Sequence, residues 1–264
     1  MLKLDNVTIS YKNVPTVQNF NLDMKEGQIV SLVGESGSGK TTVIRAVLGL
    51  LAGGGKVTEG SITFEGEDLL SYTPEQWRKL RGSDISMIFQ DSGAMMNPTR
   101  KVGKVFTEYI LTHEKISKKE AWSKGIAMLE RMRLPSPDNI MESYPFQLSG
   151  GMRQRVGIAM GMTYQPKLLL ADEPTSALDF SNQLAVWKVL REVADEGVAI
   201  LVCCHDPNHI LWFCDTAAVL TRGRIFSQGP VHEAVTETVL QHIYGPQCVR
   251  ISAGAVDMVC PRRS

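Results

Sequence analysis

Residues 34–41 read Gly34-Glu35-Ser36-Gly37-Ser38-Gly39-Lys40-Thr41 and match the pattern G-x-x-x-x-G-K-[ST]. The apolar run Gln28–Val33 precedes them and is typical of a buried strand, and Thr41–Leu50 follows with apolar residues at helical spacing. A strand, a glycine-rich loop and a helix in this order form a phosphate-binding loop. Glycines let successive backbone N–H groups converge on phosphate oxygens, and the helix adds its positive N-terminal end. We therefore predict that residues 34–41 bind the phosphates of a nucleotide.

The last two residues of this segment carry the expected chemistry. Lys40 would supply a point charge to the β- and γ-phosphates, and the Thr41 hydroxyl would bind Mg²⁺. A phosphate loop needs a second magnesium element at the end of a buried strand, and Leu168–Ala171 is followed by Asp172 and Glu173. We predict that Asp172 holds Mg²⁺ through its water shell and that Glu173 polarises the attacking water.

Strand and helix patterns alternate along most of the chain. Leu2–Ile9 alternates like an edge strand, and Lys118–Met132 and Leu148–Thr163 have helical periodicity. The other expected strands are Gln28–Val33, Ser61–Phe64, Ile85–Phe89, Lys167–Ala171, Val198–Cys203 and Thr216–Leu220, and the other expected helices are Thr41–Leu50, Pro74–Leu80, Ser181–Ala194 and Asn208–Phe213. Such alternation predicts an α/β fold with a mainly parallel sheet that helices cover on both faces.

The change of character along the chain predicts one domain in three parts. Residues 1–90 and 166–230 are expected to form the core, and residues 91–165 a mostly helical insert. Residues 231–264 are expected to be a tail, because they show no clear pattern. A length of 264 residues fits a large α/β domain, or a core with a smaller insert.

Composition excludes several classes of protein. The 28 basic and 28 acidic residues give a net charge of zero, so no field favours nucleic acid. No apolar run approaches the 18 or so residues that a membrane-spanning helix requires. The first residues alternate like a strand instead of forming a signal peptide, which predicts a cytosolic chain. The five cysteines are an odd number without C-x-x-C spacing, which favours reduced thiols.

Two further motifs resemble those of one family. They are Leu148-Ser149-Gly150-Gly151-Met152-Arg153-Gln154-Arg155 and Ala171-Asp172-Glu173-Pro174-Thr175-Ser176-Ala177-Leu178-Asp179. Over residues 1–230 the chain resembles the ATP-binding-cassette (ABC) ATPases. The resemblance implies a RecA-like phosphate-loop core with a mainly parallel sheet, an N-terminal antiparallel β portion and an inserted α-helical subdomain. It also implies that ATP and Mg²⁺ are the ligands.

The resemblance assigns individual site residues. Nucleotide contacts are implied at Tyr11, Gly34, Glu35, Ser36, Gly37, Ser38, Gly39, Lys40, Thr41, Thr42, Ser149, Gly150, Gly151 and Asp179. Tyr11 corresponds to the aromatic residue that stacks on adenine, and Asp179 to the acidic residue at the dimer seam. Gln90 matches the glutamine that reaches Mg²⁺ and water, and His205 matches the histidine that contacts the γ-phosphate. Catalysis would thus involve Glu173, His205 and Gln90, and the metal would be held by Thr41, Gln90 and Asp172.

The family mechanism implies several partners. Two ATPs close a head-to-tail dimer, in which Ser149, Gly150 and Gly151 contact a nucleotide held mainly by the second ATPase subunit. Hydrolysis opens the dimer and changes the conformation of two membrane permeases that dock near Gln90 and the helical insert. A solute-binding protein takes part indirectly, and no nucleic acid is involved. The chain would lie at the cytoplasmic face of the inner membrane as a peripheral subunit.

Finer details are similar to the peptide and nickel importer group. They are Phe89-Gln90-Asp91 followed by Asn97-Pro98, and Tyr144-Pro145-Phe146-Gln147 before the signature motif with Met152. Members of this group often pair two different ATPase subunits, which favours a heteromeric partner over a homodimer. The cargo would be nickel or another metal complex, or a di- or oligopeptide.

Some positions depart from the group pattern. Ser92 and Gly93 replace its usual proline, Phe180-Ser181-Asn182 after Asp179 is unusual, and Cys204 replaces threonine before His205. Cys248 and Cys260 do not form the cysteine cluster of some members, so no iron–sulfur centre is expected. The alternative function is a soluble ABC ATPase that serves a cytosolic enzyme complex, for example in phosphonate processing. A third hypothesis, a cassette that binds ATP without turnover, conflicts with the intact Glu173 and His205.

Overall fold

The computed structural model describes residues 1–90, 96–254 and 256–262. Asp91, Ser92 and Gly93 therefore lie outside the described residues, as do the next two residues of the expected insert. The chain divides into two compact units, Met1–Lys79 with Arg191–Ser264, and Leu80–Leu190. The insert boundaries expected from the sequence, 91–165, stay a prediction.

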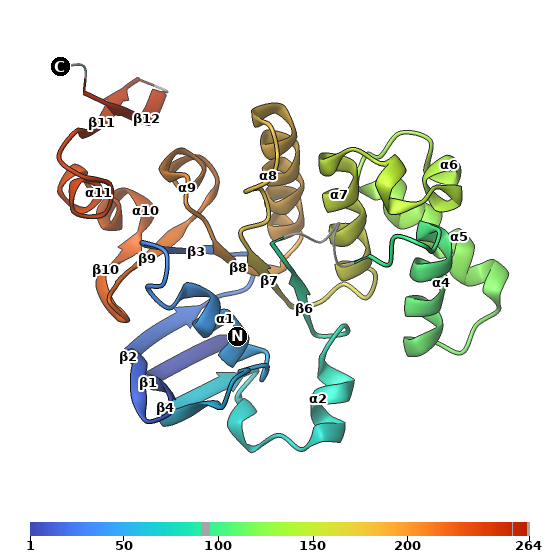
Figure 1. The fold of residues 1–264 in the computed structure, drawn as a ribbon, viewed down its shortest axis with the longest axis horizontal. Helices are drawn as coiled ribbons and strands as arrows, with labels where there is room; N and C mark the ends of the chain where they lie inside the picture. The colour runs from blue at the N-terminus through green and yellow to red at the C-terminus, as the bar shows by residue number, and fades with distance from the viewer. Residues whose placement is uncertain (91–95, 255, 263–264) are drawn as a thin grey trace. The chain divides into compact units, whose positions relative to one another are not determined.

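The first unit begins with an antiparallel sheet in the order β2 (Val14–Met24), β1 (Leu2–Tyr11), β4 (Gly55–Phe64) and β5 (Glu67–Asp68), seen in Figure 1. The prediction of an edge strand at Leu2–Ile9 is wrong, because β1 pairs with β2 on one side and with β4 on the other. The alternation of β1 indicates only that one of its faces is buried. It does not indicate how many strands pair with β1, because that depends on other parts of the sequence.

The other sheet strands of this unit are mainly parallel. β3 (Ile29–Val33) pairs in parallel with β8 (Ala199–Cys203) and with β9 (Thr216–Thr221), and β10 (Arg224–Pro230) is antiparallel to β9. Every residue of β3 and β8 is buried, as expected for strands covered on both faces. The helical elements of this part are α1 (Lys40–Val47), η1 (Leu69–Ser71), α2 (Pro74–Leu80) and α9 (Pro207–Phe213).

The segment from Val231 onward is folded, although its sequence shows no clear pattern. It forms α10 (Val231–Ala234), α11 (Glu237–Tyr244) and a hairpin of β11 (Cys248–Ala253) and β12 (Val256–Pro261). Figure 1 shows the hairpin beside α9 and α11 of the same unit, and the contacts agree. Apolar residues alternate along both strands, and Val249, Ile251 and Ala253 pair with Cys260, Met258 and Val256. Among the described side chains of the hairpin, however, only Val259 is buried.

The second unit pairs β6 (Ile85–Ile88) in parallel with β7 (Leu168–Asp172). Its helical elements are α4 (Val102–His113), α5 (Lys118–Arg131), α6 (Pro137–Glu142), η2 (Pro145–Gln147), α7 (Gly150–Gly161) and most of α8 (Phe180–Asp195). The helix α5 begins with a capping box. The Ser117 hydroxyl accepts from the N–H of Glu120, and the Glu120 carboxylate accepts from the N–H of Ser117. The helices α4, α5 and α6 pack together around buried Phe106, Ile110 and Met141. An α/β fold with mainly parallel strands and an antiparallel N-terminal sheet is confirmed.

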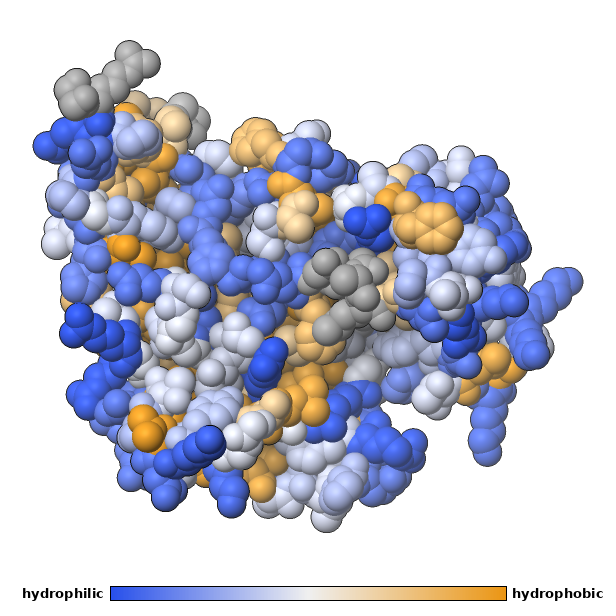
Figure 2. Space-filling view, viewed as in Figure 1, coloured by the Kyte–Doolittle hydropathy of each residue, from blue (hydrophilic) through white to orange (hydrophobic). Residues whose placement is uncertain are grey.

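The surface is predominantly polar on the face drawn in Figure 2, where apolar residues form small separate groups. In the described part of the chain, the large apolar side chains that are exposed are Val14, Leu50, Leu70, Phe146, Phe180, Trp212, Phe226, Tyr244, Ile251 and Met258. No helix in the described part of the chain combines the length and the apolar character that crossing a membrane requires.

Candidate functional site

The glycine-rich loop follows β3 directly and leads into α1. Gly34 has φ 145° and Gly39 has φ 106°, a region that favours glycine. A Cβ on Gly34 would lie 2.1 Å from the backbone oxygen of Leu220, so no other residue fits there without moving the backbone. The loop conformation that the motif predicts therefore depends on the absence of these side chains.

The side chain of Lys40 folds back onto the start of the glycine-rich loop. Its Nζ donates to the backbone oxygens of Gly34 and Glu35, at 2.8 Å each, and its side chain is buried. The hydroxyl of Ser38 is also buried, and no hydrogen-bond partner for it is found within the described structure. A buried ammonium and a buried unpaired hydroxyl in one loop suit an anionic, oxygen-rich ligand.

The helix α1 supplies the other expected phosphate ligands. Its N-cap is Gly39, which offers no side chain to accept from the first-turn N–H groups. Thr41 and Thr42 lie half-buried in that first turn. The remaining loop residues, Glu35, Ser36 and Gly37, are exposed. An uncapped helix start after a glycine-rich loop is a favourable position for phosphate.

Tyr11 ends β1 and pairs across the sheet with Gly55 of β4. A Cβ on Gly55 would lie 2.6 to 3.0 Å from atoms of the Tyr11 side chain, so the ring packs directly on the glycine backbone. The side chain of Tyr11 stays half-buried. The contact holds the ring at the end of its strand, where it could stack on a planar base.

In the second unit, Gln90 and Glu173 meet directly. The Nε2 of Gln90 donates to Oε2 of Glu173 at 3.0 Å. Asp172 is the last residue of β7 and is buried, and Glu173 follows it in the left-handed region with φ 50°. Asp172 is buried, whereas Glu173 is half-buried and bonded to Gln90, so the two adjacent carboxylates have different surroundings. Different surroundings suit two different roles, one toward metal and one toward water.

Asn182, in the stretch that departs from the family pattern, contacts both the signature segment and Asp179. Ser149 is the N-cap of α7, and its hydroxyl accepts from the N–H of Met152 at 3.3 Å. Asn182 donates to Asp179 through its backbone N–H (2.9 Å) and its side chain (2.7 Å). These bonds lower the pKa of Asp179.

The same Asn182 contacts the signature glycines. A Cβ on Gly151 would lie 2.2 Å from Oδ1 of Asn182, whereas one on Gly150 would have no contact closer than 3.4 Å. Asn182 thus fills the space beside Gly151 while it binds Asp179. The sequence signal for this residue was its departure from the family pattern, and its contacts give that departure a structural role.

His205 is exposed in the loop after β8, and its backbone oxygen accepts from the phenol of Tyr244 at 2.7 Å. Cys204, the departure before it, donates its N–H to Leu32 at 3.3 Å, and its Sγ lies 3.5 Å from the Asp206 carbonyl. Tyr244 was not expected from the sequence, because no motif links it to a histidine 39 residues earlier.

The donor set favours Mg²⁺ held together with phosphate over a metal site made of protein alone. Within residues 1–90, 96–254 and 256–262, no group of three or more His, Cys, Asp or Glu side chains could hold a metal ion. Hydroxyl, carboxylate and amide oxygens are hard ligands, and Mg²⁺ usually takes one or two carboxylates and completes its shell with phosphate and water. Thr41 of the first unit, and Asp172 and Gln90 of the second, each carry an oxygen donor of this type.

Comparisons with known proteins agree with these observations. The ABC transporter family model matches residues 17–176. The chain is 39% identical over 253 residues to the "Probable D,D-dipeptide transport ATP-binding protein DdpD" of Escherichia coli K12, covering 95% of this chain and 76% of that protein. It is 38% identical over 234 residues to the oligopeptide transport ATP-binding protein OppD of the same strain, covering 88% of this chain and 69% of that protein.

A solved structure extends the similarity to the fold. It is the dimeric post-hydrolysis state of the ATP-binding cassette MJ0796 bound to ADP and Pi, with a TM-score of 0.77 and 28% identity. The match covers 88% of this chain and 99% of that one. The chain therefore belongs to the ABC transporter family, and it is an ATP-hydrolysing member of that family.

Proposed function

We propose that the chain is the ATP-hydrolysing subunit that energises a membrane importer of short peptides. The observation that carries the proposal is the similarity to peptide-transport ATP-binding proteins along 95% and 88% of the chain. The alternative of a soluble accessory subunit has no counterpart among these relatives.

Nucleotide binding is assigned to the phosphate loop and to Tyr11. The backbone N–H groups of residues 34–42 would bind the phosphates, and Lys40 would move part of its hydrogen bonding from the loop carbonyls to phosphate oxygen. The buried, unpaired hydroxyl of Ser38 supports an oxygen-rich ligand at this loop. The ring of Tyr11, fixed on Gly55, would stack on adenine.

Hydrolysis is assigned to Glu173, Gln90 and His205. Glu173 would accept a proton from the attacking water, and the bond from Gln90 at 3.0 Å supports an oriented carboxylate. His205 would contact the γ-phosphate. The residues that would hold Mg²⁺ are Thr41, Gln90 and Asp172, and the ion would neutralise charge on the β- and γ-phosphates.

Coupling to transport is assigned to dimer closure. Ser149, Gly150 and Gly151 would bind a nucleotide held mainly by a second ABC ATPase subunit, and Asp179 would lie at the seam. The dimeric state of the MJ0796 cassette supports a dimer, and a different partner subunit is proposed here over a second copy. Two permeases would dock near Gln90 and the helical insert, at the cytoplasmic face of the inner membrane, and a solute-binding protein would deliver the cargo.

The test is to purify the tagged chain from its native membranes in mild detergent and to identify the proteins that accompany it. We expect two permeases and a second ABC ATPase. After reconstitution into vesicles with the solute-binding protein, ATP should drive uptake of di- or oligopeptides. Uptake of nickel or a metal complex instead would overturn the peptide assignment. Recovery only in the soluble fraction, with a cytosolic enzyme attached, would overturn the importer.

A further inference from the structure

The loop that carries His205 is short and is held at both ends. It comprises residues 204–206, between β8 and α9. On one side, Cys204 bonds to Leu32 of β3. On the other side, Asp206 caps α9 by accepting from the N–H of Asn208 at 2.8 Å. At the centre, the carbonyl of His205 accepts from Tyr244. The orientation of His205 therefore depends on an element far along the chain.

Tyr244 is well suited to hold that carbonyl. It is the last residue of α11, and although the residue is 41% exposed, loss of solvent around its bonded hydroxyl raises the pKa of the phenol well above the ordinary range. The phenol stays protonated and can act as a donor throughout the physiological range. The helix is itself tied to the hairpin, because Gln241 donates its Nε2 to the backbone oxygen of Cys248 at 3.2 Å.

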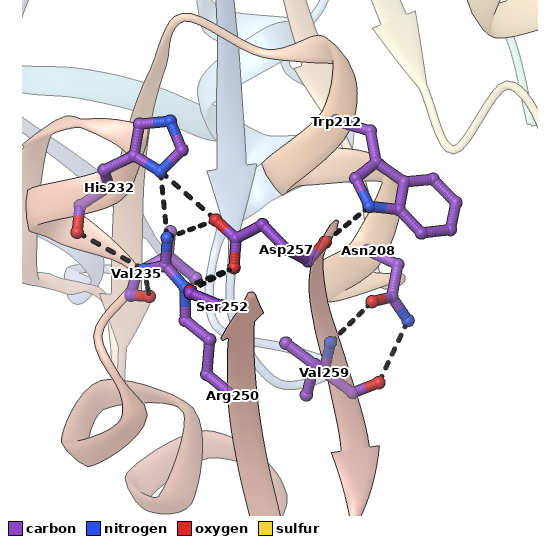
Figure 3. A network of polar contacts seen from close by, with 8 residues as sticks. All are labelled: Asn208, Trp212, His232, Val235, Arg250, Ser252, Asp257 and Val259. Atoms are coloured by element: carbon purple, nitrogen blue, oxygen red, sulfur yellow. Dashed lines mark hydrogen bonds and ion pairs between the residues drawn. The ribbon is translucent and has the colours of Figure 1, made fainter. Parts of the chain in front are cut away.

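The hairpin also holds α9, the helix that follows His205. Asn208 donates to the carbonyl of Val259 (3.2 Å) and accepts from its N–H (2.7 Å), so it satisfies both backbone groups of one β12 residue. Trp212 donates its indole N–H to the carbonyl of Asp257 at 2.6 Å. Figure 3 shows both contacts side by side along β12.

Arg250 joins the two hairpin strands to α10. Its Nε and Nη2 donate to the two carboxylate oxygens of Asp257, at 2.9 and 2.6 Å, and its Nη1 donates to the carbonyl of Val235 at 2.8 Å. The bidentate pair lowers the pKa of Asp257 to about 2. Figure 3 shows this guanidinium among its partners, with His232 beside it. The pair of Arg250 and Asp257 therefore joins the two strands of the hairpin, and β12 is also hydrogen-bonded to α9.

We propose that residues 231–254 and 256–262 form a clamp on the loop of His205, and that Tyr244 is the positioning residue through which the clamp acts. The inference rests on the role in hydrolysis proposed above for His205. Loss of the Tyr244 bond would let the imidazole leave its productive position and would lower kcat. ATP binding would be unaffected, because the phosphate loop makes its bonds through Lys40 and its own backbone.

The first test is Tyr244→Phe in the full chain, which removes the hydroxyl and keeps the ring. We expect kcat for ATP hydrolysis to fall about 3- to 10-fold, the effect of one hydrogen bond, with KM and ATP affinity unchanged. The matched control is Tyr72→Phe, because the Tyr72 phenol donates to Glu67 on the surface, outside the proposed site. An unchanged kcat in Tyr244→Phe would overturn the proposal. A fall in both variants would also overturn it.

A double-mutant cycle with His205→Ala separates positioning from general stability. The alanine variant keeps the carbonyl that Tyr244 binds but has no imidazole to position. We expect Tyr244→Phe to have no further effect on kcat in this background. An additive effect would mean that Tyr244 acts elsewhere and would overturn the clamp.

A second variant tests the chain of contacts. Trp212→Phe removes the bond to Asp257, one step further from His205, and should lower kcat by less than Tyr244→Phe does. A larger loss than that of Tyr244→Phe would overturn Tyr244 as the link. Failure of the proposed function would look different, since the wild-type chain would then lack peptide-coupled ATP hydrolysis in the reconstituted complex.

Discussion

The loop after β3 and the loop after β7 can be compared directly, because both follow a five-residue strand that is buried along its whole length. After β3, the backbone itself is the ligand-binding group, and the chain uses glycine wherever φ is positive. After β7, the side chains carry the chemistry, and Glu173 occupies a positive φ although it is not glycine. A loop that binds through its backbone excludes side chains, whereas a loop that presents a carboxylate accepts backbone strain.

The largest effect is expected from Gly34→Ala, which adds a side chain to the loop after β3. The new Cβ would meet the Leu220 oxygen at 2.1 Å, so the loop must change its path. We expect ATP binding to become undetectable by calorimetry. The control is Gly37→Ala, at φ 78° but with no atom within 4 Å of the new Cβ, which should keep measurable binding. Equal ATP affinities in Gly34→Ala and wild type would contradict the claim that the loop after β3 binds through its backbone and excludes side chains.

The reciprocal change in the other loop is Glu173→Gln. It keeps size and backbone but removes the proposed general base, so kcat should fall by about 10²- to 10⁴-fold. ATP affinity should not change, and the dimer should become more stable because it opens on hydrolysis. Steady-state ATPase assays and size-exclusion chromatography with ATP measure both effects. Glu130→Gln, an exposed carboxylate on α5, is the control, and wild-type turnover in Glu173→Gln would remove Glu173 from its role.

Lys40→Ala tests the cationic side chain of the first loop, which bonds to the carbonyls of Gly34 and Glu35. Loss of a charged donor should raise the Kd for ATP by about 10- to 100-fold. Calorimetry with a non-hydrolysable ATP analogue measures this directly. Lys56→Ala, on β4, removes an equal charge outside the loop and should leave the Kd unchanged. Unchanged affinity in Lys40→Ala would contradict the assignment of the phosphate loop.

Gln90→Ala removes the hydrogen bond to Glu173. One lost bond of 3.0 Å should lower kcat by about 3- to 10-fold, far less than loss of the carboxylate itself. In the Glu173→Gln background, the same change should have little further effect on kcat. Independent effects of the two substitutions would show that Gln90 does not act by orienting Glu173.

The smallest effect concerns the strain at Glu173. Glycine adopts φ 50° without steric cost, whereas alanine does not, so Glu173→Gly should be more stable than Glu173→Ala by about 1 kcal/mol. Urea unfolding of the two variants measures the difference, and both should lack turnover. Equal stability would mean that the backbone at Glu173 is not strained.

Much of the fold follows from local patterns, and the exceptions have physical reasons. The strand at residues 29–33 is fully buried, so its apolar run predicts it well. The long strand β2 was not expected, because its alternation is interrupted at Asn19, which has φ 50° where the pairing with β1 shifts register. The helix α4 has no side-chain cap at Lys101 to mark its start. The short helix α6 begins at Pro137, a residue that ends most helical patterns but is accepted in the first turn.

The candidate site divides in the same way. Gln90, Glu173 and the phosphate loop belong to motifs whose spacing reflects their chemistry, so the sequence could identify them. Tyr244 could not be identified, because it contacts a backbone carbonyl, a group that every residue carries. The C-terminal hairpin was missed although apolar residues alternate along its two short strands. Its folding also depends on polar bonds of Arg250, Asp257 and Asn208, which no local pattern indicates.

Trp212 gives the C-terminal clamp an optical reporter of its own. Its indole is 42% exposed and bonded to the hairpin, whereas Trp187 is fully buried and Trp77 and Trp122 lie against Gly49 and Gly103. Release of the hairpin would change the surroundings of Trp212 and leave the contacts of the other three indoles intact. The emission spectrum of the unlabelled protein should therefore report whether the hairpin is bound to α9, for example in variants that weaken the clamp, without any added dye.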